Sequence, residues 1–435
     1  MSATAIAGII FVSMIVLIML GVPIALTMLP AALIGFSLIG SPQMVISQFS
    51  TGLLSVTADY SFAVLPLFMM VGVLAGETGI ASGIYTSAKK WLGGIRGGLL
   101  YTTVGANALF GTVSGSSAAG IVVFGRIAYP ELLKEGYDRS TAAACISASG
   151  ALSCLIPPSV PILTLCLIAE ASIGTALLTG MAAGLLMVLV TFIVIKLTSV
   201  IAPEKIPPVR EEDRHVGWRE RLNSLKMLGP VLLLFMLIVG GTYLGWFHAT
   251  VGGAIATCAV VIYALFKRMP IKKIFLCMWD GCQTFSLIFI IISGGLLFSR
   301  FVTLTGLTAA ASEWIAASGM GKYAVFAIIA VFYLIAGCLM DVFSLIIVTT
   351  PIVYPLLTSV GLNGFVVVVA LVFLSELGQL TPPVGFGVFQ AAAVMKESPA
   401  LIFKGVWPFF LAMFITLVLI IVFPMLILWA PALLG

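Results

Sequence analysis

Residues 111–120 read GTVSGSSAAG and interrupt a strongly apolar region, with LLYTTVGANALF (99–110) before them and IVVFGRIAY (121–129) after. Val113 is the only larger side chain among the ten, and four residues carry a hydroxyl. The segments on either side hold about 16 residues each, or about 24 Å as helix, which is short of a hydrocarbon core of about 30 Å. Non-helical backbone at membrane depth must line a cavity or be buried in protein. We therefore expect 97–134 to form a re-entrant hairpin whose tip stops inside a membrane.

The composition supports a membrane protein along the whole chain. Of the 435 residues, 61% are hydrophobic and 9% are charged, against about 25% charged in soluble domains. Apolar runs near the length of a bilayer crossing recur throughout, so the sequence predicts an all-α polytopic membrane protein. About ten crossings are expected, at 4–20, 22–40, 61–77, 140–169, 173–199, 228–247, 249–266, 285–303, 363–395 and 404–430. Short interfacial helices are expected at 43–58 and 270–283.

The basic residues predict the orientation. With these crossings, 18 of the 21 Lys and Arg residues fall on one side, while Arg300 and Lys322 fall toward the other and Arg126 lies within the hairpin. The positive-inside rule makes the basic side cytoplasmic. Both termini are then expected in the periplasm of a bacterium, with the chain in its inner membrane.

The sequence also repeats itself at a shift of 225 residues. YPELLKEG (129–136) then aligns with YPLLTSVG (354–361), and IPPSV (156–160) with TPPVG (381–385). The shift pairs 97–134 with a second hairpin at 322–359, whose tip is GCLMDVFS (337–344). Five crossings in each half would invert the second half, a build that recurs in secondary transporters. We expect repeats at 1–200 and 228–435, joined by a charged cytoplasmic linker at 201–227.

The two proline pairs predict broken helices at 140–169 and 363–395. Proline lacks an amide donor and clashes with the preceding turn, and it disfavours helical angles in the residue before it. Each break frees carbonyl oxygens near the middle of the bilayer, which suit a cation such as Na⁺, while helix N-termini suit a carboxylate. Small-residue runs such as GTVSGSS also serve close helix packing, and a proline pair alone can be a simple kink.

Charged side chains inside the predicted membrane are few, and each has two interpretations. Intramembrane charge is costly and usually functional. Asp341 in the second tip is a candidate cation ligand, or else part of an internal ion pair or a structural hydrogen bond; it aligns with Ser116 of the first tip. Glu376, five residues before the second break's Thr381, is a weaker candidate. Arg300 either grips a substrate anion in bidentate fashion or extends to a lipid headgroup.

Several function classes are disfavoured by what the sequence contains. The seven Cys form no CxxC pair and the two His are far apart, so neither a metal centre nor a disulfide framework is indicated. Without clustered nucleophile, base or carboxylates, a membrane enzyme is disfavoured. The net charge of +5 follows from the cytoplasmic loops, and no nucleic-acid partner is expected. Hairpins that close a path from both sides favour alternating access over a channel.

The motifs together resemble the large membrane subunit of tripartite ATP-independent periplasmic (TRAP) transporters. The similarity covers GTVSGSSA, the Y-P-x-L-x-x-x-G-Y-D pattern at 129–138, IPPS (156–159) and TPPVG (381–385), in order and spacing. The chain departs from a common Ile-Pro-Phe-Phe run in the third crossing, where it has LPLF (65–68). The resemblance implies a small four-helix membrane subunit, a periplasmic substrate-binding protein, an organic-anion substrate such as a carboxylate or sulfonate, and uptake driven by Na⁺ through an elevator motion.

The resemblance also implies where the ions and substrate bind. Because the chain starts at its first expected crossing, the small subunit is expected to be separate. No organic cofactor is expected.

The first Na⁺ site would use Ser114, Ser116, Ser117, Ser149, Ser153 and the Pro157 carbonyl. The second would use Gly337, Asp341, Ser344, Gln379 and Thr381. Candidate substrate contacts, between the tips, are Ser116, Thr381 and Arg300. The alternative is a stand-alone Na⁺/dicarboxylate-type symporter of a related inverted-repeat fold.

Overall fold

The computed structural model describes residues 2–209 and 216–432, and all of its regular secondary structure is helical. This confirms the all-α class. The first half contains α1 (Ala3–Met19), α2 (Ile24–Ile39), α3 (Pro42–Ala58), η1 (Tyr60–Ala63), α4 (Val64–Glu77), α5 (Ile80–Leu92), α6 (Gly98–Ser114), α7 (Ser117–Lys134), α8 (Arg139–Gly150), α9 (Leu152–Leu155), α10 (Val160–Ala169) and α11 (Ile173–Ile201).

The second half begins after the linker, in which η2 (Pro203–Lys205) is helical and residues 210–215 lie outside the described part. It contains α13 (Trp218–Ser224), η3 (Leu225–Leu228), α14 (Gly229–Phe235), η4 (Met236–Gly240), α15 (Gly241–Tyr243), α16 (Ala249–Phe266), α17 (Ile271–Leu304), α18 (Leu307–Ser318), α19 (Lys322–Leu339), α20 (Val342–Ser359), α21 (Gly364–Gly378), α22 (Phe386–Met395), α23 (Pro399–Val422) and α24 (Met425–Ala432). The linker expected at 201–227 therefore contains a short helix, α13.

The helices are long and apolar enough for a multi-pass membrane protein. Eight helical segments of the described chain could each cross a membrane, or nine if α8–α10, bent by 46° at its break, counts as one span. Two of the eight are α19 and α20, the second hairpin, which was expected to be re-entrant, whereas α1, α2, α21 and α22 are shorter apolar helices outside the count. The helices of the second hairpin, with 18 residues each, are longer than the expected legs and reach about 27 Å.

One predicted boundary is absent. The interfacial helix expected at 270–283 and the crossing expected at 285–303 form one continuous helix, α17. At the corresponding place in the first half, the Asp59 side chain accepts the Ser61 amide at 2.8 Å and ends α3. The residue 225 positions later, Thr284, instead donates its hydroxyl to the Asp280 carbonyl one turn back at 2.8 Å. The helix continues because no side chain competes for its backbone amides.

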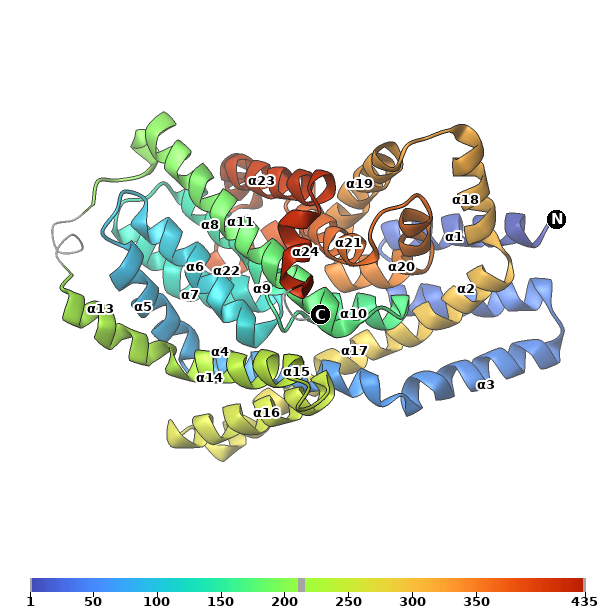
Figure 1. Cartoon of the computed structure of the whole chain (residues 1–435), viewed down its shortest axis with the longest axis horizontal. Helices are drawn as coiled ribbons and strands as arrows, with labels where there is room; N and C mark the ends of the chain where they lie inside the picture. Colours follow the sequence, from blue (N-terminus) through green and yellow to red (C-terminus); the bar gives the residue numbers. More distant parts are fainter. Residues whose placement is uncertain (1, 210–215, 433–435) are drawn as a thin grey trace.

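The predicted hairpin segments are each occupied by two antiparallel helices, α6–α7 and α19–α20. Figure 1 shows the two hairpins on opposite sides of the centre of the molecule, with α1 near one end of the long axis and α13 near the other. The helix starts recur at the shift read from the sequence: α20 begins 225 residues after α7, and α21 begins 225 residues after α8. Each hairpin is thus followed by its own interrupted helix.

Candidate functional site

The first hairpin tip is a tight turn packed against the first break. α6 ends at Ser114, and Gly115 has a φ of +59°, in the left-handed region that favours glycine. The amide of Val160, directly after the break, donates to the Gly115 carbonyl at 3.3 Å. A Cβ on Gly115 would lie 2.2 Å from the Pro158 carbonyl oxygen. The lack of bulk in the tip therefore permits direct backbone contact between the tip and the break.

Polar side chains join the first hairpin to the first broken helix. Asn107 on α6 is fully buried and donates its amide to the Ser149 hydroxyl on α8 at 2.7 Å. Ser153 on α9 donates to the Asn107 backbone carbonyl at 3.1 Å. Gly120 on α7 leaves room for this group, because a Cβ there would lie 2.5 Å from the Asn107 amide oxygen and 2.9 Å from the Ser153 hydroxyl. The predicted ligands Ser149 and Ser153 are thus held together around Asn107.

The remaining predicted groups of the first site lie at the tip itself. Ser116 accepts the Ala119 amide at 3.4 Å and caps α7. The Ser117 amide donates to the Cys154 sulfur at 3.1 Å. Ser114 is buried, and its hydroxyl has no hydrogen-bond partner among the described residues. An unpaired buried hydroxyl is uncommon, so Ser114 is available to a ligand. Pro157 lies in the break, joined to Pro158 by a cis peptide bond.

Glu376 of α21 reaches the first tip rather than the second. Its carboxyl lies beside the Cys154 thiol and Ser117. The side chain is 3% exposed, and its Oε1 has no hydrogen-bond partner in the described chain. The single buried carboxyl of the two broken helices therefore lies where the second half meets the first.

The second tip is joined to the second break in a similar way. The Gly385 amide donates to the Cys338 carbonyl at 3.0 Å, and the Val384 amide donates to the Cys338 sulfur at 3.3 Å. Gly385 occupies the position 225 residues after Val160, so both breaks donate to their tips from the same position. The Pro382–Pro383 peptide bond is also cis. Gly337 packs its backbone closely against Gly378 of α21.

Asp341 and Ser344 interact with each other at the start of α20. Asp341 accepts the Ser344 amide at 3.1 Å, and the Ser344 hydroxyl also donates to the Asp341 carboxylate. Gln379 is buried beside Gly387, while the Thr381 hydroxyl donates to the Leu377 carbonyl at 2.9 Å. Gly337 thus contacts the broken helix, whereas the polar atoms of Asp341 and Ser344 are engaged within the tip.

The two breaks differ in exposure. Residues 141–160 are all buried, whereas Pro382, Pro383 and Val384 are exposed. The first break is therefore covered by protein on every side, whereas the second is partly uncovered. The two candidate cation sites are therefore in different environments in this conformation.

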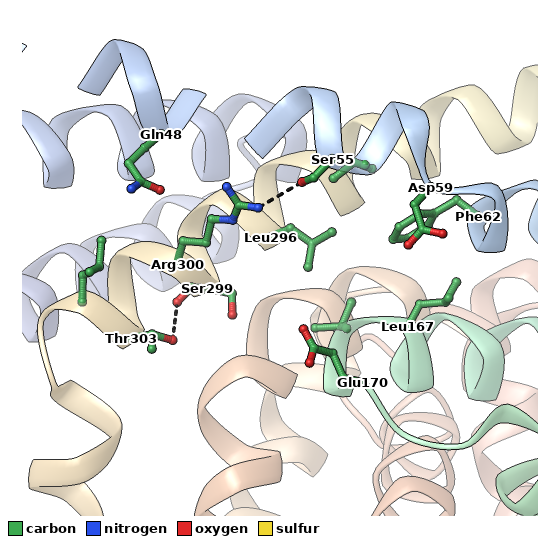
Figure 2. A pocket seen from close by; sticks show the side chains of 13 residues that line it. Gln48, Ser55, Asp59, Phe62, Leu167, Glu170, Leu296, Ser299, Arg300 and Thr303 are labelled. Atoms are coloured by element: carbon green, nitrogen blue, oxygen red, sulfur yellow. Dashed lines mark hydrogen bonds between the residues drawn. The ribbon is translucent and has the colours of Figure 1, made fainter. Parts of the chain in front are cut away.

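Arg300, the third candidate substrate contact, is part of a separate cavity of about 700 Å³ between α3, α10 and α17. Its guanidinium donates to the Ser55 hydroxyl at 3.0 Å and to the Thr51 hydroxyl at 3.5 Å, both on α3. Figure 2 shows Glu170, at the end of α10, on the opposite wall. Neither Ser116 nor Thr381 lines this cavity, so the structure does not bring the three candidates together.

Comparison with known proteins assigns the chain to a family. Residues 11–426 match the family described as Tripartite ATP-independent periplasmic transporter, DctM component. The chain belongs to this family. As a TRAP transporter component it is not an enzyme, as the sequence predicted. The C4-dicarboxylate TRAP transporter large permease protein DctM of Vibrio cholerae is 27% identical, covering 98% of both chains. The ectoine TRAP transporter large permease protein TeaC of Halomonas elongata is 27% identical, covering 95% of this chain and 96% of the relative.

A solved structure supports the fold. The YdaH transporter of Alcanivorax borkumensis superposes with a TM-score of 0.61 at 15% identity, covering 88% of this chain and 89% of that one. At this identity the likeness concerns architecture alone.

Two site residues of the TRAP permease were not among the predicted ligands. Asn107 is an amide within an otherwise apolar helix, a signal that the sequence does contain. Cys154 is buried, and its sulfur accepts the amide of Ser117. In the described residues no group of three or more His, Cys, Asp and Glu side chains could hold a metal ion.

Proposed function

We propose that this chain imports an organic acid anion across the bacterial inner membrane, driven by a Na⁺ gradient. A periplasmic binding protein would deliver the substrate, and a small four-helix membrane subunit would complete the transporter. The family assignment supports transport with a binding protein. Relatives of equal identity are named for C4-dicarboxylates, for ectoine and for isethionate, so the proposed substrate class includes both carboxylates and sulfonates.

The observation that carries this proposal is the bonding of each tip to its own break. In both halves a backbone amide just after the proline pair donates to a carbonyl of the preceding hairpin. Such a junction gathers unwound backbone and half-helix ends, the groups with which broken helices of transporters bind ions and anionic solutes. The fit of Na⁺ to the first junction is supported by the unpaired hydroxyl of Ser114 and by the hydroxyls of Ser116, Ser117, Ser149 and Ser153.

The second Na⁺ site would be formed by Asp341 and Ser344 with the backbone near Gly337 and the break residues Gln379 and Thr381. Its carboxylate offers a formal charge that the first tip lacks, because Ser116 stands at the equivalent position. The substrate would lie between the tips, in contact with Ser116 and Thr381. Arg300 would act outside that site, at the separate cavity.

An elevator mechanism fits this arrangement. The recurrence of helix starts at 225 residues supports two repeats, at 1–200 and 228–435, and an odd number of crossings in each would invert the second. Both termini would then be periplasmic and the basic linker cytoplasmic. The two hairpins and broken helices would move together as one transport domain against a scaffold of the remaining long helices.

Reconstituted vesicles test the proposal. The chain is inserted with the small subunit, the binding protein is added outside, and uptake of labelled succinate and ectoine is measured under an inward Na⁺ gradient. We expect uptake that stops when K⁺ replaces Na⁺ and when the binding protein is left out. Equal uptake in K⁺ would contradict Na⁺ coupling. Uptake by the chain alone would instead support the stand-alone symporter.

A further inference from the structure

A second polar cavity lies where α5, the junction of η3 and α14, and the end of α16 meet. Its volume is about 510 Å³. Figure 1 shows α5, α14 and α16 on the same side of the molecule as the linker. We call it the Lys226–Lys267 cavity. Its polar lining consists of Ser82, Thr86, Asn223, Lys226, Tyr263 and Lys267. No site discussed above includes these residues.

The charge of this cavity is positive and uncompensated. Lys226 and Lys267 are exposed, and neither forms an ion pair with a carboxylate in the described chain. Other lysines of the same predicted side do have partners: Lys273 lies 2.7 Å from Glu77, and Lys90 lies 3.9 Å from Glu220. The Lys267 ammonium lies 5.6 Å from the centre of the Tyr263 ring, a cation–π contact that holds it at the cavity wall. Two unpaired ammonium groups, an amide and two hydroxyls suit a phosphate.

The surroundings point to a phosphate that belongs to a lipid. Met227 and Pro230 add an apolar wall to the cavity. Phe266, next to Lys267, is 82% exposed, and Leu232, Leu233 and Met236 on the neighbouring segment are also exposed. A soluble anion gains nothing from such a border, whereas a phospholipid places its phosphate beside its glycerol and acyl chains. Basic pockets between membrane helices on the cytoplasmic side bind anionic headgroups.

We propose that the Lys226–Lys267 cavity binds the headgroup of an anionic phospholipid of the cytoplasmic leaflet. The two lysines bind the phosphate, and the Asn223 amide with the Ser82 and Thr86 hydroxyls binds the glycerol end. α5 belongs to the first half of the chain, whereas α14 and α16 belong to the second, so a lipid here contacts both halves. The binding itself does not depend on Na⁺ coupling.

Native mass spectrometry of the full chain in detergent, titrated with phosphatidylglycerol and separately with phosphatidylcholine, tests this inference. The test variant is Lys226→Gln with Lys267→Gln. The control is Lys196→Gln with Lys272→Gln, exposed lysines of the same predicted side that do not line the cavity. We expect the test variant to weaken phosphatidylglycerol binding about thirtyfold, with phosphatidylcholine binding unchanged and the control equal to wild type.

Equal weakening by the control pair would mean a diffuse charge effect and would overturn the proposal. Displacement of phosphatidylglycerol by excess inorganic phosphate would assign the cavity to a soluble anion instead. Loss of the lipid when the small membrane subunit is added would assign the cavity to that subunit. If the test variant unfolds, Lys267→Arg keeps the charge, and retained phosphatidylglycerol binding in it would still support the proposal, while lost binding would oppose it.

Discussion

Ser116 and Asp341, which lie 225 positions apart, cap the second helices of the two hairpins in the same way. Ser116 accepts the amide of Ala119, and Asp341 accepts the amide of Ser344, three residues on in each case. Serine and aspartate are both strong N-caps. The equivalence separates two roles of Asp341, because capping needs only an acceptor oxygen, whereas binding a cation benefits from the full negative charge.

The first prediction uses this separation. Asp341→Ser should keep the cap and the thermal stability of the protein but nearly abolish Na⁺-dependent uptake, because the charge is lost. Asp341→Ala should abolish uptake as well and also lower the free energy of unfolding by about 1 kcal/mol through the lost cap. Uptake in vesicles and thermal unfolding in detergent measure the two effects. Normal uptake with an unchanged Na⁺ dependence in Asp341→Ser would remove the carboxylate from the cation site.

The second prediction concerns Asn107. Asn107→Ala removes the amide donor to Ser149 within a fully buried group, so we expect a loss of about 1–3 kcal/mol in stability. We also expect a weaker apparent affinity for Na⁺, because the hydroxyls of Ser149 and Ser153 lose their common support. Gln43→Ala, at an exposed position on α3, is the matched control and should change neither quantity. A wild-type Na⁺ dependence in Asn107→Ala would separate this cluster from the ion site.

The interruptions of helix at the small-residue run and at the proline pairs have local signals in the sequence. A run of small residues cannot fill a core, and adjacent prolines cannot continue a helix. The continuity of α17 was not predictable in this way, since it depends on one position. The Asp59 side chain caps and ends a helix, whereas the Thr284 hydroxyl donates to a carbonyl one turn earlier in a continuous helix. Aspartate and threonine are both common at helix ends and within helices.

The candidate site was predictable only within each half. Contacts between a tip and the break that follows it can be inferred from the repeat and from the order of the motifs. The position of Glu376 beside Ser117 and Cys154 joins residues from the two halves, and nothing near any of them in sequence indicates the contact. The cavity that Arg300 lines is also formed by distant segments, and its sequence context does not indicate them.

The third prediction concerns an interaction at the predicted cytoplasmic end. Glu397, in the loop between α22 and α23, accepts the Tyr129 hydroxyl at 2.7 Å and two Arg139 nitrogens at 2.5 and 3.1 Å. The hydrogen bond from Tyr129, aided by Arg139, holds the pKa of Glu397 below its ordinary value. A carboxyl whose pKa is lowered in the folded state stabilises the fold at pH values above its ordinary pKa of about 4.3. This stabilisation is lost as the pH falls through the folded-state pKa.

Glu397→Gln should therefore lower the melting temperature at neutral pH, and the difference from wild type should shrink below about pH 4. Thermal unfolding at a series of pH values measures this. Glu220→Gln is the control, because its pairing with Lys90 is loose and exposed, and surface pairs contribute little. A pH-independent difference for Glu397→Gln would show that the carboxylate's charge is not what stabilises the loop.

The last prediction concerns the crossing of α19 and α21 at Gly337 and Gly378. A Cβ on Gly378 would lie 2.7 Å from the Gly337 Cα, 2.9 Å from the Gly337 carbonyl carbon and 3.0 Å from the Tyr333 carbonyl oxygen. All three are backbone atoms, so no side chain can turn aside and the two helices must separate. We expect Gly378→Ala to cost about 1–3 kcal/mol of stability and to reduce uptake, because the second tip moves away from its break. Gly8→Ala is the matched control: a Cβ there meets no atom within 4 Å, and alanine in a helix should be neutral or stabilising. If the two variants have the same melting temperature, the close crossing does not hold the second tip in place.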